Sequence, residues 1–378
     1  LSAGPFAGQP ALYNRASRDL TQSSELTLRT IQLGGRGTLL PQRINYALVF
    51  LAGDNAVTHL ESGNRIRLLD GSVTVTLPVD LHLRLGLFKY PGSEEGGQPQ
   101  PPGNYINFSS LTRQLLLEHY FRNDGSNPRD ANFPSSASLF RDSGAMLFGA
   151  HPFGNWEGSW GVMVGNGSGV ELDYGQGRRE LYLSMALERI FSGEQEKRHG
   201  LKFFSWFQDG ERQLQVGPLL REESIYRQRW GGGVTLRSQR WRAIFEGGKG
   251  KGVILTGSDG GAIPGSLDNA GLTVSSFNLH PHDIAWGWYG DLGYRLLPPW
   301  WLDFRYDTYH QATDTDLAER RFDTITLGSH LFVTRTTRLM VNYEFRHYRA
   351  PKLPDNALQN ILLKGVDNRL AFQLSQSF

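Results

Sequence analysis

The end of the chain alternates strictly between apolar and polar side chains and stops on an aromatic residue. Leu370, Phe372 and Phe378 fall on one face of an extended segment, and Arg369 and Gln373 fall on the other. Successive side chains of a β-strand point to opposite faces, so this pattern predicts a strand with one apolar face. A terminal strand of this kind is typical of the seam of a transmembrane β-barrel. The edge strand of a soluble sandwich is the alternative interpretation.

The composition favours the barrel over a helical membrane protein. The chain has 45 Gly, 21 Phe, 14 Tyr and 9 Trp among 378 residues, and no Cys. Its mean hydropathy is −0.39. No apolar run approaches the ~18 residues that a spanning helix needs. A barrel escapes this limit because only alternate residues face lipid.

The same alternation recurs along most of the chain. Leu81, Leu83 and Leu85 alternate with His82 and Arg84, which gives a strand with one apolar and one polar face. We expect strands near residues 25–37, 43–53, 65–77, 80–90, 141–153, 156–165, 178–191, 197–208, 223–237, 240–250, 284–297, 300–312, 319–334, 337–349 and 366–378. Because bacterial barrels have an even number of strands, we expect one more near residues 9–19.

The connections between these strands are short at one end and long at the other. Residues 153–155, 238–239 and 297–299 read as turns, whereas residues 250–282 and 350–365 read as long polar loops. Outer-membrane barrels show this asymmetry between their two rims. The sequence therefore predicts an all-β, antiparallel transmembrane barrel of about 16 strands, built as a single domain over residues 1–378.

One connection, residues 92–140, is too long for a simple turn. Its first part is rich in Gly, Pro and Gln, and its second part reads SSLTRQLLLEHYFR from residue 109. Ser109 or Ser110 can cap a short helix, which would carry Leu111, Leu115, Leu116 and Tyr120. We expect this third loop to fold into the barrel and form a constriction, although an exposed flap is the alternative.

Charged residues occupy the polar faces of the predicted strands, and we expect them to line the pore. These candidates are Arg84, Arg227, Arg229, Arg242, Glu246, Asp291, Arg295, Asp303, Arg305, Asp307, Glu344, Arg346 and Arg369. The long loop adds Arg113, Glu118, His119 and Arg122. Opposite charges on facing walls orient dipolar solutes and bias ion flow. The alternative is that these charges pair across strands and only satisfy one another.

Tryptophans and catalytic motifs narrow the function further. Trp156, Trp241, Trp286, Trp288, Trp300 and Trp301 suit interfacial girdles, with a sugar-stacking track as the alternative. The segment GGKGKG at 247–252 lacks the Ser or Thr of a phosphate-binding loop. His310 near Asp307, Asp314 and Asp316 is the best candidate for a hydrolase site, and Asp314 with Asp316 is a weak calcium candidate. We expect no enzyme activity, no cofactor and no metal.

Several short stretches resemble the phosphate-selective porin O and P family of Gram-negative outer membranes. They are 26–35 (LTLRTIQLGG), 44–53 (INYALVFLAG), 85–91 (LGLFKYP), 140–144 (FRDSG), 162–169 (VMVGNGSG) and 368–378 (NRLAFQLSQSF). The resemblance implies sixteen strands, a homotrimer and a third loop folded inward. The chain departs from the phosphate-selective members, which have clustered lysines near this loop. Here Lys89 is the only lysine near it, and the loop carries Glu94, Glu95 and Glu118 beside Arg113 and Arg122. That departure argues against strong capture of phosphate.

These observations predict a porin of the bacterial outer membrane that passes small hydrophilic, possibly anionic, solutes by diffusion. Its expected partners are membrane lipid, lipopolysaccharide and the solutes themselves. The net charge of +2 offers no field for nucleic acid. A barrel that houses a periplasmic or lumenal partner, such as a cytochrome or a polymer chain, is the alternative. Leu1 is not a start methionine, so we expect that any signal peptide has been removed.

Overall fold

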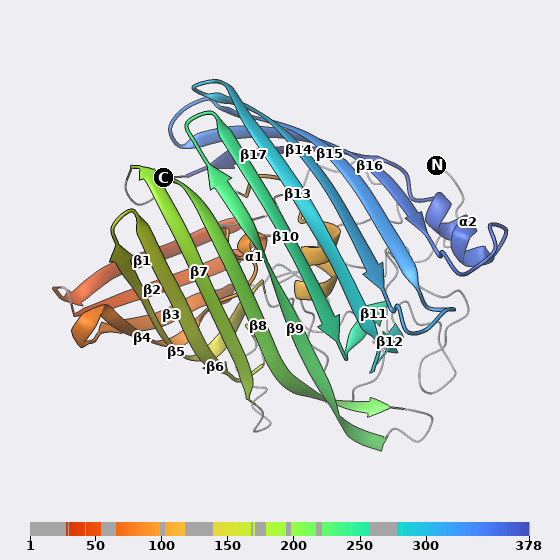
Figure 1. Ribbon diagram of the computed structural model, residues 1–378, viewed down its shortest axis with the longest axis horizontal. Coiled ribbons are helices and arrows are strands. Elements are labelled where there is room, and N and C mark those ends of the chain that lie inside the picture. Colours follow the sequence, from red (N-terminus) through yellow and green to blue (C-terminus); the bar gives the residue numbers. More distant parts are fainter. Residues whose placement is uncertain are drawn as a thin grey trace.

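The computed structural model describes residues 28, 30–41, 43–53, 66–98, 103–117, 139–167, 169–170, 179–193, 198–216, 221–256, 278–280 and 282–377. Fifteen strands form one antiparallel sheet, in which each pairs with its neighbours along the chain (Figure 1). They are β1 (Ile31–Leu40), β2 (Ile44–Ala52), β3 (Arg67–Thr76), β4 (Leu81–Lys89), β5 (Arg141–Phe153), β6 (Trp156–Gly165), β7 (Glu180–Ser192), β8 (His199–Val216), β9 (Arg221–Arg237), β10 (Trp241–Lys251), β13 (Ile284–Leu297), β14 (Trp300–Gln311), β15 (Arg320–Phe332), β16 (Thr337–Arg349) and β17 (Arg369–Gln376). A separate ladder joins β11 (Ile254–Thr256) to β12 (Asn278–His280).

These fifteen strands are the ones predicted from the alternation of side chains. The sixteenth, near residues 9–19, lies outside the described residues. The hairpin of β8 and β9 is longer than predicted, because pairing continues to Val216 opposite Arg221. Residues 208–213 (QDGERQ) carry no apolar side chain, so no alternation marked the start of this extension as strand.

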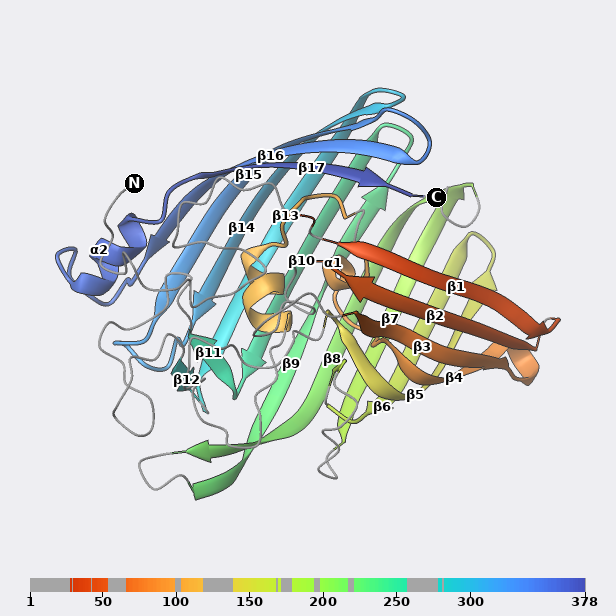
Figure 2. The same cartoon turned by 180° about the vertical axis from the view of Figure 1, so that it is seen from behind.

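The sheet curves around an enclosed space, with β1 and β17 as its two edges (Figure 2). In the part of the chain that the structure describes, these two strands do not pair with each other, so the sheet is not closed. Its connections differ between the two rims. One rim has turns such as Gly154 and Asn155, where Gly154 takes the left-handed φ of +62°, and the other has the long loops. The predicted asymmetry is confirmed.

Burial alternates along the strands in the opposite sense to a soluble protein. On β14, Leu302 and Phe304 are exposed on the outer face, whereas Asp303, Arg305 and Asp307 are buried on the inner face. An exposed apolar face with charged groups turned inward is what a barrel in lipid requires. No helix within the described ranges is long and apolar enough to span a membrane.

Four short helical segments complete the fold within the described residues, and the first of them, η1 (Pro78–Asp80), lies between β3 and β4. In the third loop, α1 (Glu94–Gly97) and the π-helical turn η2 (Thr112–Leu116) lie in the space that the sheet encloses (Figure 2). α2 (Leu358–Lys364) lies in the connection between β16 and β17. The predicted cap is confirmed, because Ser109 Oγ accepts a hydrogen bond from Thr112 N at 3.3 Å. The Gly/Pro/Gln composition of residues 92–103 gave no signal for α1.

Candidate functional site: the inserted loop and the passage beside it

Helix α1 is held at both of its ends by side chains. Ser93 Oγ accepts a hydrogen bond from Gly96 N at 3.2 Å, which caps the start of the helix. At the other end, Lys89 Nζ donates to the carbonyl oxygens of Gly96 (3.0 Å), Gly97 (3.3 Å) and Gln98 (2.5 Å). A cation at the end of a helix satisfies carbonyl groups that have no partner within the helix. These contacts give the short helix a defined position.

Glu246 of β10 binds the start of α1 from the barrel wall. Its carboxylate is fully buried and accepts hydrogen bonds from Ser93 Oγ (3.1 Å), Glu94 N (3.1 Å) and Glu95 N (3.3 Å). Trp206 Nε1 (2.9 Å) and Tyr289 Oη (2.7 Å) donate to the same carboxylate. Five donors compensate the cost of burying this charge. Glu246 thus joins the inserted loop to β8, β10 and β13.

Arg305 of β14 forms a second attachment. Its Nη1 donates to Glu95 Oε1 and to the carbonyl oxygen of Asn107, both at 3.0 Å. The guanidinium carbon lies 4.4 Å from the centre of the Tyr105 ring. Glu95 also accepts hydrogen bonds from the backbone (3.0 Å) and hydroxyl (2.6 Å) of Ser109. One buried ion pair therefore connects both halves of the loop to the wall.

The middle of the loop is bonded to β13 and β16. Tyr105 Oη donates to Asp291 Oδ1 at 2.9 Å, and Ile106 N donates to Asn342 Oδ1 at 2.7 Å. Asn107 Nδ2 donates to Glu344 Oε1 at 2.9 Å. Burial, together with the nearby Asp291 carboxylate, raises the pKa of Tyr105 well above its usual value. The hydroxyl consequently stays protonated and donates to Asp291.

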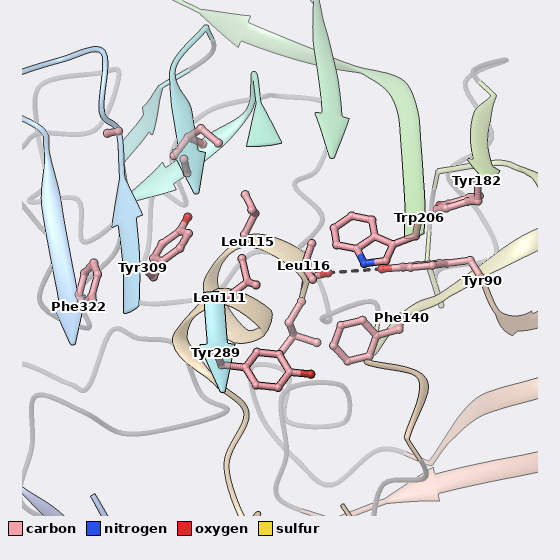
Figure 3. Close-up of a cluster of buried hydrophobic side chains, with 14 of the residues drawn as sticks. Tyr90, Leu111, Leu115, Leu116, Phe140, Tyr182, Trp206, Tyr289, Tyr309 and Phe322 are labelled. Carbon is pink, nitrogen blue, oxygen red and sulfur yellow. Dashed lines mark hydrogen bonds between the residues drawn. The ribbon is translucent and has the colours of Figure 1, made fainter. Parts of the chain in front are cut away.

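Apolar contacts secure the turn η2. Leu111, Leu115 and Leu116 are almost fully buried in a cluster with aromatic side chains from the wall (Figure 3). Tyr90 Oη donates to the carbonyl oxygen of Leu116 at 3.4 Å, and its ring stacks on Tyr182 with the ring centres 4.5 Å apart. Burying three leucines contributes about 5 kcal/mol or more to holding the turn in place.

A cavity of about 530 Å³ remains beside the loop. The start of the loop lines one side of it with Pro91, Gly92 and Glu94, and the inner wall of β4 to β8 lines the other. Lys202 Nζ on that wall lies 2.5 Å from Glu94 Oε2, and Arg237 Nη2 lies 3.1 Å from Glu94 Oε1. The lining is therefore polar where loop and wall meet.

Part of this lining consists of aromatic rings with cations beside them. The rings of His82 and Phe148 stack with their centres 5.1 Å apart, and the guanidinium of Arg84 lies 5.2 Å from the centre of Phe148. On the facing strand β8, Lys202 Nζ lies 5.6 Å from the centre of the Phe204 ring. The cavity thus offers both charged and apolar contacts to a solute.

Comparison with solved structures identifies the architecture. The protein is similar to the high-pH structure of Pseudomonas putida OprB. The sequence identity is 10%, the match covers 92% of this chain and 87% of that chain, and the TM-score is 0.54. It is also similar to Salmonella typhi OmpF in complex with daunomycin, with 10% identity, 95% and 93% of the two chains covered, and a TM-score of 0.52. Both are outer-membrane porins.

The chain has the porin fold. No protein-family model and no curated protein matches the sequence. The resemblance to the phosphate-selective porin O and P family therefore stays a prediction, because an identity of 10% carries the fold alone. The resemblance also implied a third loop that folds inward, and residues 91–98 and 103–117 do lie inside the barrel.

The porin fold places most of the predicted pore residues on the inner face, opposite the exposed apolar side chains. This holds for Arg84, Arg227, Arg229, Arg242, Glu246, Asp291, Arg295, Asp303, Arg305, Asp307, Glu344, Arg346 and Arg369. Arg113 is buried within the loop. Glu118, His119 and Arg122 lie outside the described residues. Their role in lining the pore stays a prediction.

Many of these inner charges are already paired across strands, as the alternative interpretation supposed. Arg242 Nη2 lies 3.0 Å from Asp291 Oδ1 and 2.9 Å from Asp303 Oδ1. Arg369 Nη2 lies 2.6 Å from Glu344 Oε2. Arg227 pairs with Glu180, and Arg229 donates to the carbonyl oxygens of Lys251, Gly252 and Val253. The ion pairs among these contacts neutralise their charges, so the paired residues contribute little net charge to the passage.

Sequence reasoning missed Lys202, although a signal was present. Leu201 and Phe203 flank it, and Phe203 is exposed on the outer face. Lys202 therefore lies on the inner face by the alternation that located the other charges.

Two other predictions need correction. His310 and Asp307 lie on opposite faces of β14, because they are an odd number of residues apart on one strand. His310 stacks on Trp286 with the ring centres 4.0 Å apart, whereas Asp307 accepts a hydrogen bond from Ser110 N at 2.9 Å. The proposed hydrolase site is not assembled. Trp301 is also on the inner face, where it stacks on His330, so it does not belong to a girdle.

Proposed function

We propose that this protein is a porin of the bacterial outer membrane that passes small hydrophilic solutes by passive diffusion. The observation that carries the proposal is a loop bonded across the inside of a porin-fold barrel, with a cavity of about 530 Å³ beside it. A cavity of this size accommodates a small solute with part of its hydration shell. Because the loop is attached to the wall, the proposed channel does not require a lid that opens and closes.

The attachment pattern supports a constriction that stays in place. Glu246 and Arg305 contact the loop at separate points, and both are buried on the inner face. Charged hydrogen bonds of this kind are stronger than neutral ones. We therefore propose that residues 92–140 set the size limit of the channel.

The conduit alternative requires an outward loop and a lumen filled by another molecule. The described residues 91–98 and 103–117 instead pack against the inner wall, where they occupy space that a cytochrome or a polymer would need. This contact pattern favours a channel for small solutes.

We also propose that the barrel assembles as a homotrimer, which native mass spectrometry of the detergent-solubilised protein would test.

The charges beside the cavity give a test of solute passage. Replacing Lys202→Gln removes a cation from the lining, so we expect the reversal potential under a salt gradient to shift toward cation selectivity. Replacing Glu94→Gln removes an anion from the same place, so we expect the opposite shift. Both are measured on single channels in a planar bilayer.

Lys249→Gln is the matched control, because Lys249 is an exposed residue on the outer face of the barrel. It removes the same charge without changing the lining, so the reversal potential should not move. A barrel that inserts stably and conducts no current would contradict the proposed function. Equal shifts for Lys202→Gln and Lys249→Gln would show that ions do not pass beside Lys202.

A further inference from the structure

The outer face of the sheet carries a row of aromatic and cationic side chains across six strands. The strand pairings place Trp230 of β9 opposite Lys249, Lys249 opposite Trp286, Trp286 opposite His310, His310 opposite Arg321, and Arg321 opposite Arg349. All six lie on the face that otherwise exposes Leu, Phe and Trp. We refer to these six residues as the cationic row.

The same register continues over β4 to β8 with apolar residues only. Its members there are Leu83, Leu147, Val162, Leu183 and Phe207. Strands in a barrel are tilted, so a row of paired residues climbs from one rim toward the other. Arg349 is the last residue of β16, and His310 is the last but one of β14. The charges therefore begin where the row reaches the rim that carries the long loops.

The side chains of the cationic row are oriented by one another. The Trp286 and His310 rings are parallel within 8°, and Lys249 Nζ lies 6.0 Å from the centre of the Trp230 ring. Asp323 contacts Arg321 through Nε at 2.8 Å, so this contact does not occupy the two terminal nitrogens of the guanidinium. Among the described residues, no carboxylate pairs with Lys249 or Arg349.

The spacing suits a headgroup with more than one phosphate. Neighbouring strands are ~4.8 Å apart, which places Arg321 about 5 Å from Arg349 and about 14 Å from Lys249 in the direction across the strands. Guanidinium groups bind phosphate oxygens in pairs, and flat aromatic rings suit the boundary between acyl chains and sugars. Two cationic points separated by aromatic rings thus match two phosphates on a sugar.

We propose that the cationic row binds the phosphorylated disaccharide headgroup of lipopolysaccharide in the outer leaflet. The proposal rests on the outer-membrane location proposed above, since short turns face the periplasm and long loops face outward in such barrels. It does not depend on what passes through the pore. Because the row lies on the outer face, a loss of lipid binding and a loss of conductance are separate results.

Native mass spectrometry of the detergent-solubilised barrel tests the proposal, with bis-phosphorylated and dephosphorylated lipid A as probes. The test variant combines Lys249→Gln, Arg321→Gln and Arg349→Gln. Each cation near an anionic surface contributes about fivefold to affinity, so the triple variant should bind bis-phosphorylated lipid A about a hundredfold more weakly. Dephosphorylated lipid A should bind the native protein and the variant equally weakly.

Arg189→Gln is the matched control. Arg189 is an exposed arginine beside Trp156, with its guanidinium 5.9 Å from that ring, but it lies at the rim with short turns. Binding of bis-phosphorylated lipid A should be unchanged in this variant, and the conductance of the triple variant should match that of the native channel. That conductance also shows that the triple variant is folded.

Two results would overturn the proposal. Undiminished binding of bis-phosphorylated lipid A by the triple variant would show that the cationic row is not the binding site. An equal loss in Arg189→Gln would show attraction to any surface cation. A change of oligomeric state in the triple variant, with lipid binding intact, would instead assign the row to contacts between copies of the chain.

Discussion

At the scale of single residues, buried charges on the inner wall attach the loop. Arg305 is 1% exposed, and its Nη1 lies 3.0 Å from Glu95 Oε1 while its Nε lies 3.4 Å from Asp307 Oδ2. A buried ion pair gives little net stability against an apolar replacement of the whole group, but the loss of one member leaves the other charge uncompensated. Arg305 is therefore the residue whose replacement should affect the loop most strongly.

We expect Arg305→Met to lower the free energy of unfolding by about 3–5 kcal/mol, because the buried carboxyl groups of Glu95 and Asp307 would lose the cation that compensates their burial. Equilibrium unfolding in urea, followed by tryptophan fluorescence in lipid vesicles, measures this change. Arg189→Met is the control, since it removes an exposed arginine on the outer face. A loss of the same size in both variants would contradict the role assigned to Arg305.

At the scale of the element, the turn η2 depends on its apolar contacts. Leu116 is 1% exposed, and its carbonyl oxygen accepts the hydrogen bond from Tyr90. We expect Leu116→Ala to cost about 2–5 kcal/mol of local stability through the cavity it leaves. Hydrogen exchange at the amides of Ile106 and Ser110 should then become faster, because both amides bond to the wall.

Leu339→Ala is the matched control for this element, because Leu339 is 43% exposed on the outer face of β16. It removes the same atoms without a cavity in the loop cluster. Unchanged exchange at Ile106 and Ser110 is expected there. Slow exchange at these amides in Leu116→Ala would show that the turn is held by its hydrogen bonds alone.

The elements differ in how far the sequence predicts them. Strands can be predicted because lipid on one side imposes a period of two, which is how Leu370 and Phe372 were assigned to an apolar face. The loop contacts are not readable in this way. Glu94 and Glu246 are 152 residues apart in the chain, and no local pattern relates them. The extension of the β8 and β9 hairpin beyond residue 208 was missed because residues 208–213 carry no apolar side chain.

At the scale of the whole molecule, fifteen strands and an inward loop make a porin fold with a passage beside the loop. Position on the inner face could be predicted for Glu246, Arg305 and Asp307, but their bonding to the loop could not, since it depends on where the loop folds. The strand near residues 9–19 that would bring the total to sixteen stays a prediction.

The most direct test of the account compares single-channel conductance of the native chain with that of a chain lacking residues 94–132. If the loop narrows an open diffusion channel, both proteins conduct, and the shortened one has the larger conductance in the same salt. Equal conductance would show that the loop does not limit the passage. A native channel that inserts stably but conducts nothing, even without the loop, would contradict passive diffusion through this barrel.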